Sequence, residues 1–228
     1  MSTVVIGLAT YRREREYRSL LDRIRETKGR HDVTVVVVQD GEKCYVEPIE
    51  ERKFKVVACW QAHNGKFRYW KTVSNLWRQV KALGLRDFVY IQLADDLHLT
   101  SSWLTEALRL HRLKGPGAVI NLLRCHRAET GNWGFMPQPH GKYLYSNAFI
   151  DGCFVMDGRM LEVLNWQVNP IPRDRWRKGK KLGSLVWRQV SDRLSLKRVP
   201  MYMVSQPIIT TDWSPHLSVM NPDRTPIT

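Results

Sequence analysis

Two adjacent carboxylates, Asp95 and Asp96, directly follow an apolar run of the chain. Two like charges at the end of a strand repel each other, so a compensating charge must lie nearby. A hard divalent cation such as Mn²⁺ or Mg²⁺ provides that charge and would in turn hold a diphosphate. Alternatively, the two acids only favour the start of a helix, because Thr100 and Ser101 introduce a helical pattern soon after them.

The elements that must position this pair are short apolar runs that alternate with amphipathic helices. The run at 32–39 is apolar without alternation, which is typical of a strand covered on both faces in a parallel sheet. Tyr17, Leu20, Leu21 and Ile24 recur at the spacing of one helical stripe. We expect strands at residues 3–9, 32–39, 54–59, 87–93 and 118–123, and helices around residues 17–24, 73–80 and 101–113.

Four such alternations predict an α/β fold with a mostly parallel sheet flanked by helices. In these sheets the ligand lies beyond the carboxyl ends of the strands, where Asp95 and Asp96 lie, which favours the metal interpretation. The second half of the chain is less regular. There we expect a long functional loop at 131–146, a strand at 150–156, a short helix at 160–164, a basic segment at 170–181, a helix at 185–190 and one or two strands within 201–209.

The order of the segments TVVIGLATYRR, VTVVVVQDG, NGK and VYIQLADDLHLTSSWL resembles the start of a GT-A (Rossmann-like) nucleotide-sugar glycosyltransferase, similar to family 2. The resemblance covers residues 3–113, about half of the chain. It implies a UDP-sugar donor and a divalent metal ion, Mn²⁺ or Mg²⁺. We therefore expect a single domain, 1–228, with a nucleotide-sugar-binding half at 1–115 and an acceptor-binding half at 116–228.

The resemblance also implies roles for particular residues. It assigns Asp96 to the metal and Asp95 to ribose or sugar hydroxyls, while Leu93 replaces the first acid of the fullest motif. The positions that match the family's nucleoside and sugar-diphosphate contacts are Thr10, Tyr11, Arg12, Asp40, Asn64, Gly65 and Lys66. Alternatively, Asp40 only forms a turn with the glycine after it, and Lys66 is a solvated loop charge.

Two further residues are candidates for the metal shell. Some relatives carry a histidine there after a C-terminal strand, and in the segment IITTDWSPHLSVM that place is taken by Asp212. Oxygen suits Mn²⁺ or Mg²⁺ as well as imidazole does, so Asp212 is a plausible ligand by resemblance. His216, four residues later, is the weaker candidate, because a lone histidine is more often a surface or core residue.

An inverting transferase also needs a general base, because the acceptor hydroxyl must lose its proton. Asp151, at the head of IDGCFVM, is our first candidate, followed by Asp174 and Asp192. Asp151 could equally cap a turn with Gly152. A retaining mechanism can do without such a base, so the stereochemistry stays open.

The charge balance points to an anionic partner. The 228 residues are 43% hydrophobic and 25% charged, which excludes disorder, and the formal net charge is +14. Alternatively, the basic surface only keeps the protein soluble. Basic residues interleaved with an aromatic suit phosphate contacts and base stacking, and one such cluster consists of Arg173, Arg175, Trp176, Arg177, Lys178, Lys180 and Lys181.

The size, charge and fold resemble those of the bacteriophage enzymes that glycosylate 5-hydroxymethylpyrimidines in DNA. We therefore expect modified DNA as the acceptor. The alternatives are a surface-polysaccharide or lipid acceptor, a nucleotidyltransferase, or a nucleic-acid-binding protein without catalysis. The four cysteines are widely spaced and the sequence shows no membrane span, so we expect a cytoplasmic protein, in the host cytoplasm if it is encoded by a phage.

Overall fold

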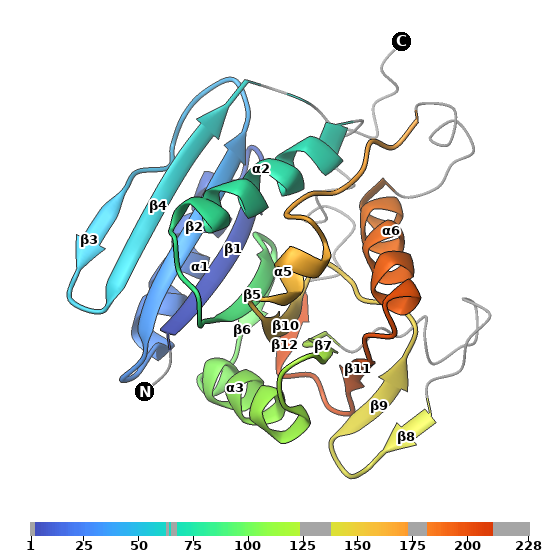
Figure 1. The fold of residues 1–228 in the computed structure, drawn as a ribbon. Helices are drawn as coiled ribbons and strands as arrows, with labels where there is room; N and C mark the ends of the chain where they lie inside the picture. Colours follow the sequence, from blue (N-terminus) through green and yellow to red (C-terminus); the bar gives the residue numbers. More distant parts are fainter. Residues whose placement is uncertain (1–2, 63, 65–67, 124–137, 173–181, 212–228) are drawn as a thin grey trace.

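The computed structural model describes residues 3–62, 64, 68–123, 138–172 and 182–211. These residues form a ten-stranded sheet covered by helices on both faces (Figure 1). Its strands, in spatial order, are β3 (Ile49–Glu51), β4 (Phe54–Gln61), β2 (Asp32–Asp40), β1 (Thr3–Thr10), β5 (Val89–Ala94), β10 (Phe154–Asp157), β7 (Val119–Asn121), β11 (Met201–Val204), β9 (Leu144–Asn147) and β8 (Gln138–His140). The predicted α/β fold with its large central sheet is confirmed.

The helices divide into two layers. The apolar stripe of α1 (Glu14–Thr27) packs on one face, against alternate residues of β1 and β2 such as Ile6 and Val35, and α3 (Trp103–Lys114) covers the same face beside β7 and β10. Val5 and Val36 point to the other face, which is covered by α2 (Tyr69–Ala82), α5 (Met160–Val163) and α6 (Leu182–Leu196). Since β2 is buried on both faces, its uninterrupted apolar run needs no alternation.

The strands that carry the predicted site run in the same direction. β1 pairs in parallel with β2 on one side and with β5 on the other, and β2 pairs in parallel with β4. Their carboxyl ends therefore meet at one edge of the sheet. Of the predicted strand at 150–156, residues 154–156 lie in β10, which runs antiparallel between β5 and β7, whereas residues 150–153 precede it as a loop.

Two helices end next to glycines with a left-handed backbone conformation. Gly84 follows α2 with a φ of +67° and Gly115 follows α3 with a φ of +75°, which are conformations that side chains other than glycine disfavour. Among the described residues, no helix is long and apolar enough to span a membrane.

One alternative and one expectation need correction. Asp95 and Asp96 do not open a helix, because β6 (Leu97–Leu99) separates them from α3 and pairs with β12 (Ile209–Thr211). Residues 138–140 and 144–147 are not loop but the antiparallel strands β8 and β9, which a turn at 141–143 joins. These segments carry polar residues and gain their strand character from pairing with neighbours, so no apolar period marks them in the sequence.

Candidate functional site

Polar side chains gather at the carboxyl edge of the parallel strands. Thr10 ends β1, Asp40 ends β2, and Asp95 and Asp96 form the turn that follows β5. Thr10 Oγ1 donates a hydrogen bond of 2.9 Å to Asp95 Oδ2 across 85 residues of sequence. The structure thus brings together residues that the sequence linked only through the expected order of strands.

Asp95 is the buried member of the acidic pair, with 2% of its surface exposed. Besides the Thr10 hydroxyl, Asp95 Oδ2 accepts a 3.3 Å hydrogen bond from the backbone N–H of Tyr11. Burial raises the pKa of Asp95 to about 7 and the neighbouring Asp96 adds to the rise, whereas Arg13 and the two hydrogen bonds oppose it. Near neutral pH the charge of Asp95 therefore depends on the balance between its burial and these contacts.

Arg13 supplies a positive charge to both acids. Its Nη1 lies 3.5 Å from Asp95 Oδ1 and 3.3 Å from Asp96 Oδ2, and only 8% of the side chain is exposed. The metal ion expected from the sequence is therefore not the only source of compensating charge, and Arg13 was not among the predicted site residues. The sequence signal for Arg13 was its position, directly after the first strand and before the first helical stripe.

A chain of hydroxyl groups connects Arg13 to Asp95. The Tyr45 hydroxyl accepts a 3.1 Å hydrogen bond from the backbone N–H of Arg13 and lies 2.7 Å from Thr10 Oγ1. Because Thr10 gives its only hydroxyl proton to Asp95, Tyr45 must be the donor to Thr10. Burial raises the pKa of Tyr45, so its phenol keeps that proton at neutral pH. Tyr45 is a second residue that sequence reasoning missed.

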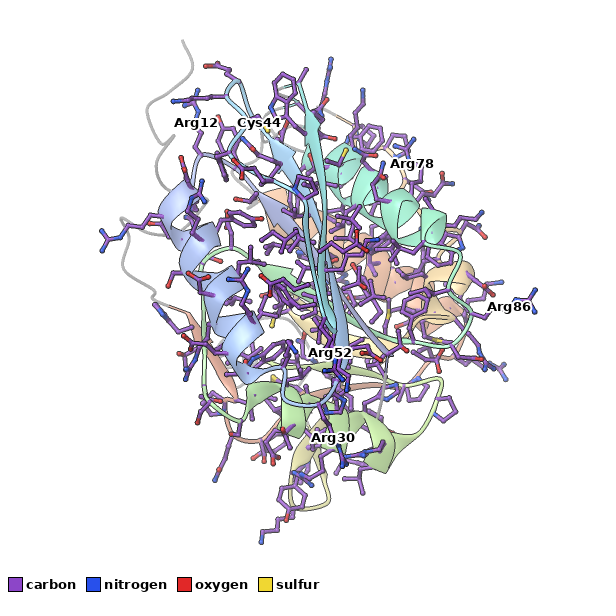
Figure 2. The ribbon with its side chains drawn as sticks, turned by 90° about the vertical axis from the view of Figure 1, so that its left-hand side faces the viewer. Arg12, Arg30, Cys44, Arg52, Arg78 and Arg86 are labelled. Atoms are coloured by element: carbon purple, nitrogen blue, oxygen red, sulfur yellow. The ribbon has the colours of Figure 1, made fainter. Side chains whose placement is uncertain are left out.

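The loop after β2 forms a cavity beside this network. Gln39 shapes the loop, since its amide nitrogen donates to the Lys43 carbonyl and its amide oxygen accepts a 2.9 Å hydrogen bond from Tyr45 N–H. The cavity has a volume of about 220 Å³, and its lining residues are Arg12, Glu14, Gln39, Gly41, Glu42, Lys43 and Tyr45. Figure 2 shows Arg12 and Cys44 together at this end of the molecule.

Of the residues predicted to contact the nucleoside, Arg12 lines this cavity, and Asp40 directly precedes Gly41, which also lines it. Asp40 is buried and accepts a 2.7 Å hydrogen bond from the backbone N–H of Asn64. Arg12 has a left-handed φ of +52°, and its guanidinium lies 5.2 Å from the centre of the Tyr11 ring and 3.5 Å from Glu42 Oε1. With 55% of its side chain exposed, Arg12 lies at the mouth of the cavity, free to meet a ligand from solvent.

Asp151 lies on the loop before β10, near the acidic pair. Its backbone N–H donates a 2.9 Å hydrogen bond to Asn121 Oδ1, and its own Oδ1 accepts one of 2.8 Å from Gly152 N–H. Burial raises the pKa of Tyr69, and the charges of Asp95, Asp151 and Asp96 raise it further. Since one hydroxyl feels all three carboxylates, they share one region.

The third candidate base is placed elsewhere. Asp192 lies on α6, where it is 60% exposed and forms a 3.1 Å ion pair with Arg188. None of its hydrogen bonds or ion pairs within the described ranges reaches the acidic edge. The remaining candidates lie outside the described residues; they are Gly65, Lys66, Arg173, Asp174, Arg175, Trp176, Arg177, Lys178, Lys180, Lys181, Asp212 and His216.

The fold is similar to that of two proteins solved with nucleotide sugars. The first is residues 1–349 of S. aureus TarS with UDP-GlcNAc, with a TM-score of 0.58, 12% identity, and coverage of 90% of this chain and 56% of that chain. The second is the mannosyltransferase PcManGT from Pyrobaculum calidifontis with GDP-Man and Mn²⁺, with a TM-score of 0.55, 12% identity, and coverage of 90% and 57%. The GT-A-like fold is confirmed. The chain spans a little more than half of either protein, and no protein-family model or curated protein matches it.

The acidic pair suits a metal ion that is shared with a ligand. Among the described residues, no group of three or more His, Cys, Asp or Glu side chains is placed to hold an ion by itself. Magnesium-type sites commonly use one or two carboxylates and take their remaining ligands from water and substrate phosphates. Asp96, whose side chain is 22% exposed beside the buried Asp95, meets that requirement.

Proposed function

We propose that the chain is a glycosyltransferase that takes a sugar from a UDP-type nucleotide-sugar donor with the help of Mn²⁺ or Mg²⁺. The observation that carries the proposal is the meeting of Thr10, Asp40 and the Asp95–Asp96 turn at the carboxyl edge of parallel strands, beside a cavity. This edge is where open α/β sheets bind their ligands. The two proteins of similar fold, TarS and PcManGT, were solved with nucleotide sugars.

The donor fits with its nucleoside in the cavity and its diphosphate towards Asp96. Asp40 and the backbone around Tyr11 would contact the nucleoside, with Arg12 covering it from the solvent side. Asp95 already accepts hydrogen bonds from Thr10 and Tyr11, so we assign it to holding this loop in place as well as to donor hydroxyl groups.

Asp96 would hold the divalent ion, which when bound neutralises the diphosphate as it leaves the sugar. Lys66 and Arg12 would add positive charge around the same phosphates. We retain Asp212 and His216 as candidates for completing the metal shell from the C-terminal segment.

Asp151 is the base we assign for an inverting reaction. The acceptor hydroxyl gives its proton to the Asp151 carboxylate while its oxygen forms a bond to the sugar and the bond to the diphosphate breaks. The hydrogen bond from Asp151 N–H to Asn121 fixes the loop that carries this carboxylate. Asn121 is fully buried, so the position of the loop is tied to β7 in the core.

For the acceptor we propose a hydroxymethylated pyrimidine in DNA. The net charge of +14 and the basic segment around Trp176 support a polyanionic acceptor. Figure 2 shows Arg12 near one end of the molecule and Arg30 near the opposite end. A base inside a duplex must be flipped out before its hydroxymethyl group reaches Asp151.

The test measures UDP release from UDP-glucose with Mn²⁺ in the presence of DNA containing 5-hydroxymethylcytosine, DNA containing 5-hydroxymethyluracil, or unmodified DNA. We expect release with a modified DNA only. Asp96→Asn should abolish release, whereas Asp22→Asn, the same change at an exposed acid on α1, should leave it unchanged.

Each other outcome has a definite meaning. Slow release that no DNA accelerates refutes the DNA acceptor and retains the transferase. Failure with UDP-glucose and with a panel of other nucleotide sugars, together with steeply salt-dependent DNA binding, refutes the transferase in favour of a binding protein.

A further inference from the structure

We infer that Arg13 occupies the charge position of the divalent ion while the donor is absent, so that the ion and a nucleoside diphosphate bind as a coupled pair. The inference rests on the metal site of the proposed function and adds a positioning residue to it. Its basis is the ion-pair geometry at the carboxyl edge of β1 and β5.

Arg13 is the cation that contacts this acidic pair within the described part of the chain. Its guanidinium reaches one oxygen of each carboxylate, at 3.5 Å for Asp95 and 3.3 Å for Asp96. The neighbouring Arg12 points to solvent and pairs with Glu42 on the loop after β2. In the absence of a diphosphate, a divalent ion that binds Asp96 must therefore approach a carboxylate that already has a positive partner.

The contact is of a kind that can be exchanged. Charge-assisted hydrogen bonds between a guanidinium and a carboxylate are typically about 2.7–2.9 Å long and often doubled. The distances of 3.3 and 3.5 Å from Nη1 to the two acids are longer, so Nη1 interacts with the charge of both acids without forming a short hydrogen bond to either. By contrast, its backbone is fixed through the hydrogen bond from its N–H to Tyr45. The side chain can therefore change partners without moving the start of α1.

A diphosphate supplies the alternative partner. It brings negative charge to the same edge, and phosphate oxygens suit a guanidinium as well as carboxylates do. When the ion binds Asp96, the Arg13 guanidinium can pair with the phosphates. This new contact offsets the loss of its contact with Asp96. The ion alone has no such partner to offer. We therefore expect the protein to bind the ion more weakly without the diphosphate than with it. This difference should exceed the contribution of direct binding between the ion and the phosphates.

The experiment is a calorimetric titration of Mn²⁺ at pH 8, with and without saturating UDP, on the full chain. Arg13→Met removes the charge and keeps much of the length. Its matched control is Arg18→Met, at an exposed arginine on α1 that pairs with Glu14. We expect Arg13→Met to bind Mn²⁺ alone at least about fivefold more tightly than the unchanged chain, and the enhancement by UDP to fall by a similar factor. Arg18→Met should match the unchanged chain in both titrations.

Two further variants keep the result interpretable. Arg13→Lys retains the charge and should stay within about twofold of the unchanged chain, which separates loss of charge from damage to the fold. Asp96→Asn should remove Mn²⁺ binding in every background. Because coupling is reciprocal, Mn²⁺ must strengthen UDP binding by the same factor that UDP strengthens Mn²⁺ binding.

The inference is overturned if Arg13→Met binds Mn²⁺ alone no more tightly than the unchanged chain or than Arg18→Met. In that case Mn²⁺-dependent UDP release by the unchanged chain would still support the proposed function. If Mn²⁺ binds none of the variants, the metal site itself is wrong, and both the inference and the metal-dependent part of the proposed function fail.

Discussion

The buried carboxyl of Asp95 should make the metal-free protein less stable as the pH rises. Its pKa is raised from the ordinary value of 3.8 to about 7, mainly by burial, so between these values the folded state binds a proton that the unfolded state has released. The stabilising contribution is therefore complete below pH 4 and is lost as the pH rises through 7. The difference between the two pKa values corresponds to about 4 kcal/mol.

The substitution that isolates this effect is Asp95→Asn. The amide is neutral at every pH and keeps an oxygen that can accept hydrogen bonds from the Thr10 hydroxyl and from the Tyr11 N–H. We therefore expect the variant to be more stable than the unchanged chain at pH 8, by up to about 4 kcal/mol, and close to it at pH 4. The measurement is urea denaturation of both proteins at several pH values in EDTA, and other titrating groups cancel in the comparison.

The reasoning would be refuted by a stability difference that does not vary between pH 4 and pH 8. A difference that grows in favour of the unchanged chain as the pH rises would mean that Arg13 stabilises the ionised form more than burial disfavours it. Glu106→Gln on α3, where the acid is paired with Arg109 on the surface, provides the control for a change of charge outside the site.

Three further results are expected. Removing divalent cations with EDTA should abolish UDP release and Mn²⁺ should restore it, whereas activity that persists in EDTA would contradict the metal assignment. Tyr45→Phe removes a hydroxyl that both donates and accepts in the site and should lower the free energy of unfolding by about 1–3 kcal/mol in urea, while Tyr143→Phe at an exposed ring should change it little. Gly7→Ala should cost about 1–3 kcal/mol in the same assay, because the new Cβ would lie 2.1 Å from the Tyr90 hydroxyl oxygen; Tyr90→Phe should recover part of that loss, and full stability of Gly7→Ala alone would show that the core adjusts.

Most of the fold could be predicted from local sequence patterns. The uninterrupted valines of β2 and the helical stripe that begins at Tyr17 are properties of neighbouring residues, so the sequence predicts them without knowledge of the rest of the chain. The order of strands then places Asp95 and Asp96 at the ligand edge. The short strands β6 and β9 escaped prediction because they pair with β12 and β11, far along the chain, and β8 in turn pairs with β9.

The contacts inside the site could not be predicted in the same way. The hydrogen bond from Thr10 to Asp95 spans 85 residues, and the contact of Tyr45 with Thr10 spans 35. Such contacts depend on the register of β1 between β2 and β5 and on how the loop after β2 folds back over the edge. The need for a positive charge beside two acids was visible in the sequence, but the side chain that provides it was not.

The state of Asp95 itself argues for function. An asparagine at this position would keep an acceptor for Thr10 and for the Tyr11 N–H, and it would not carry a buried charge at neutral pH. If the side chain only held the loop after β1, the carboxylate would be the less stable choice by up to about 4 kcal/mol at pH 8. A residue that lowers stability where a close isostere would not is typical of a binding or catalytic site. At this edge the carboxylate contributes negative charge, shared with Asp96, and that charge is what a divalent ion requires.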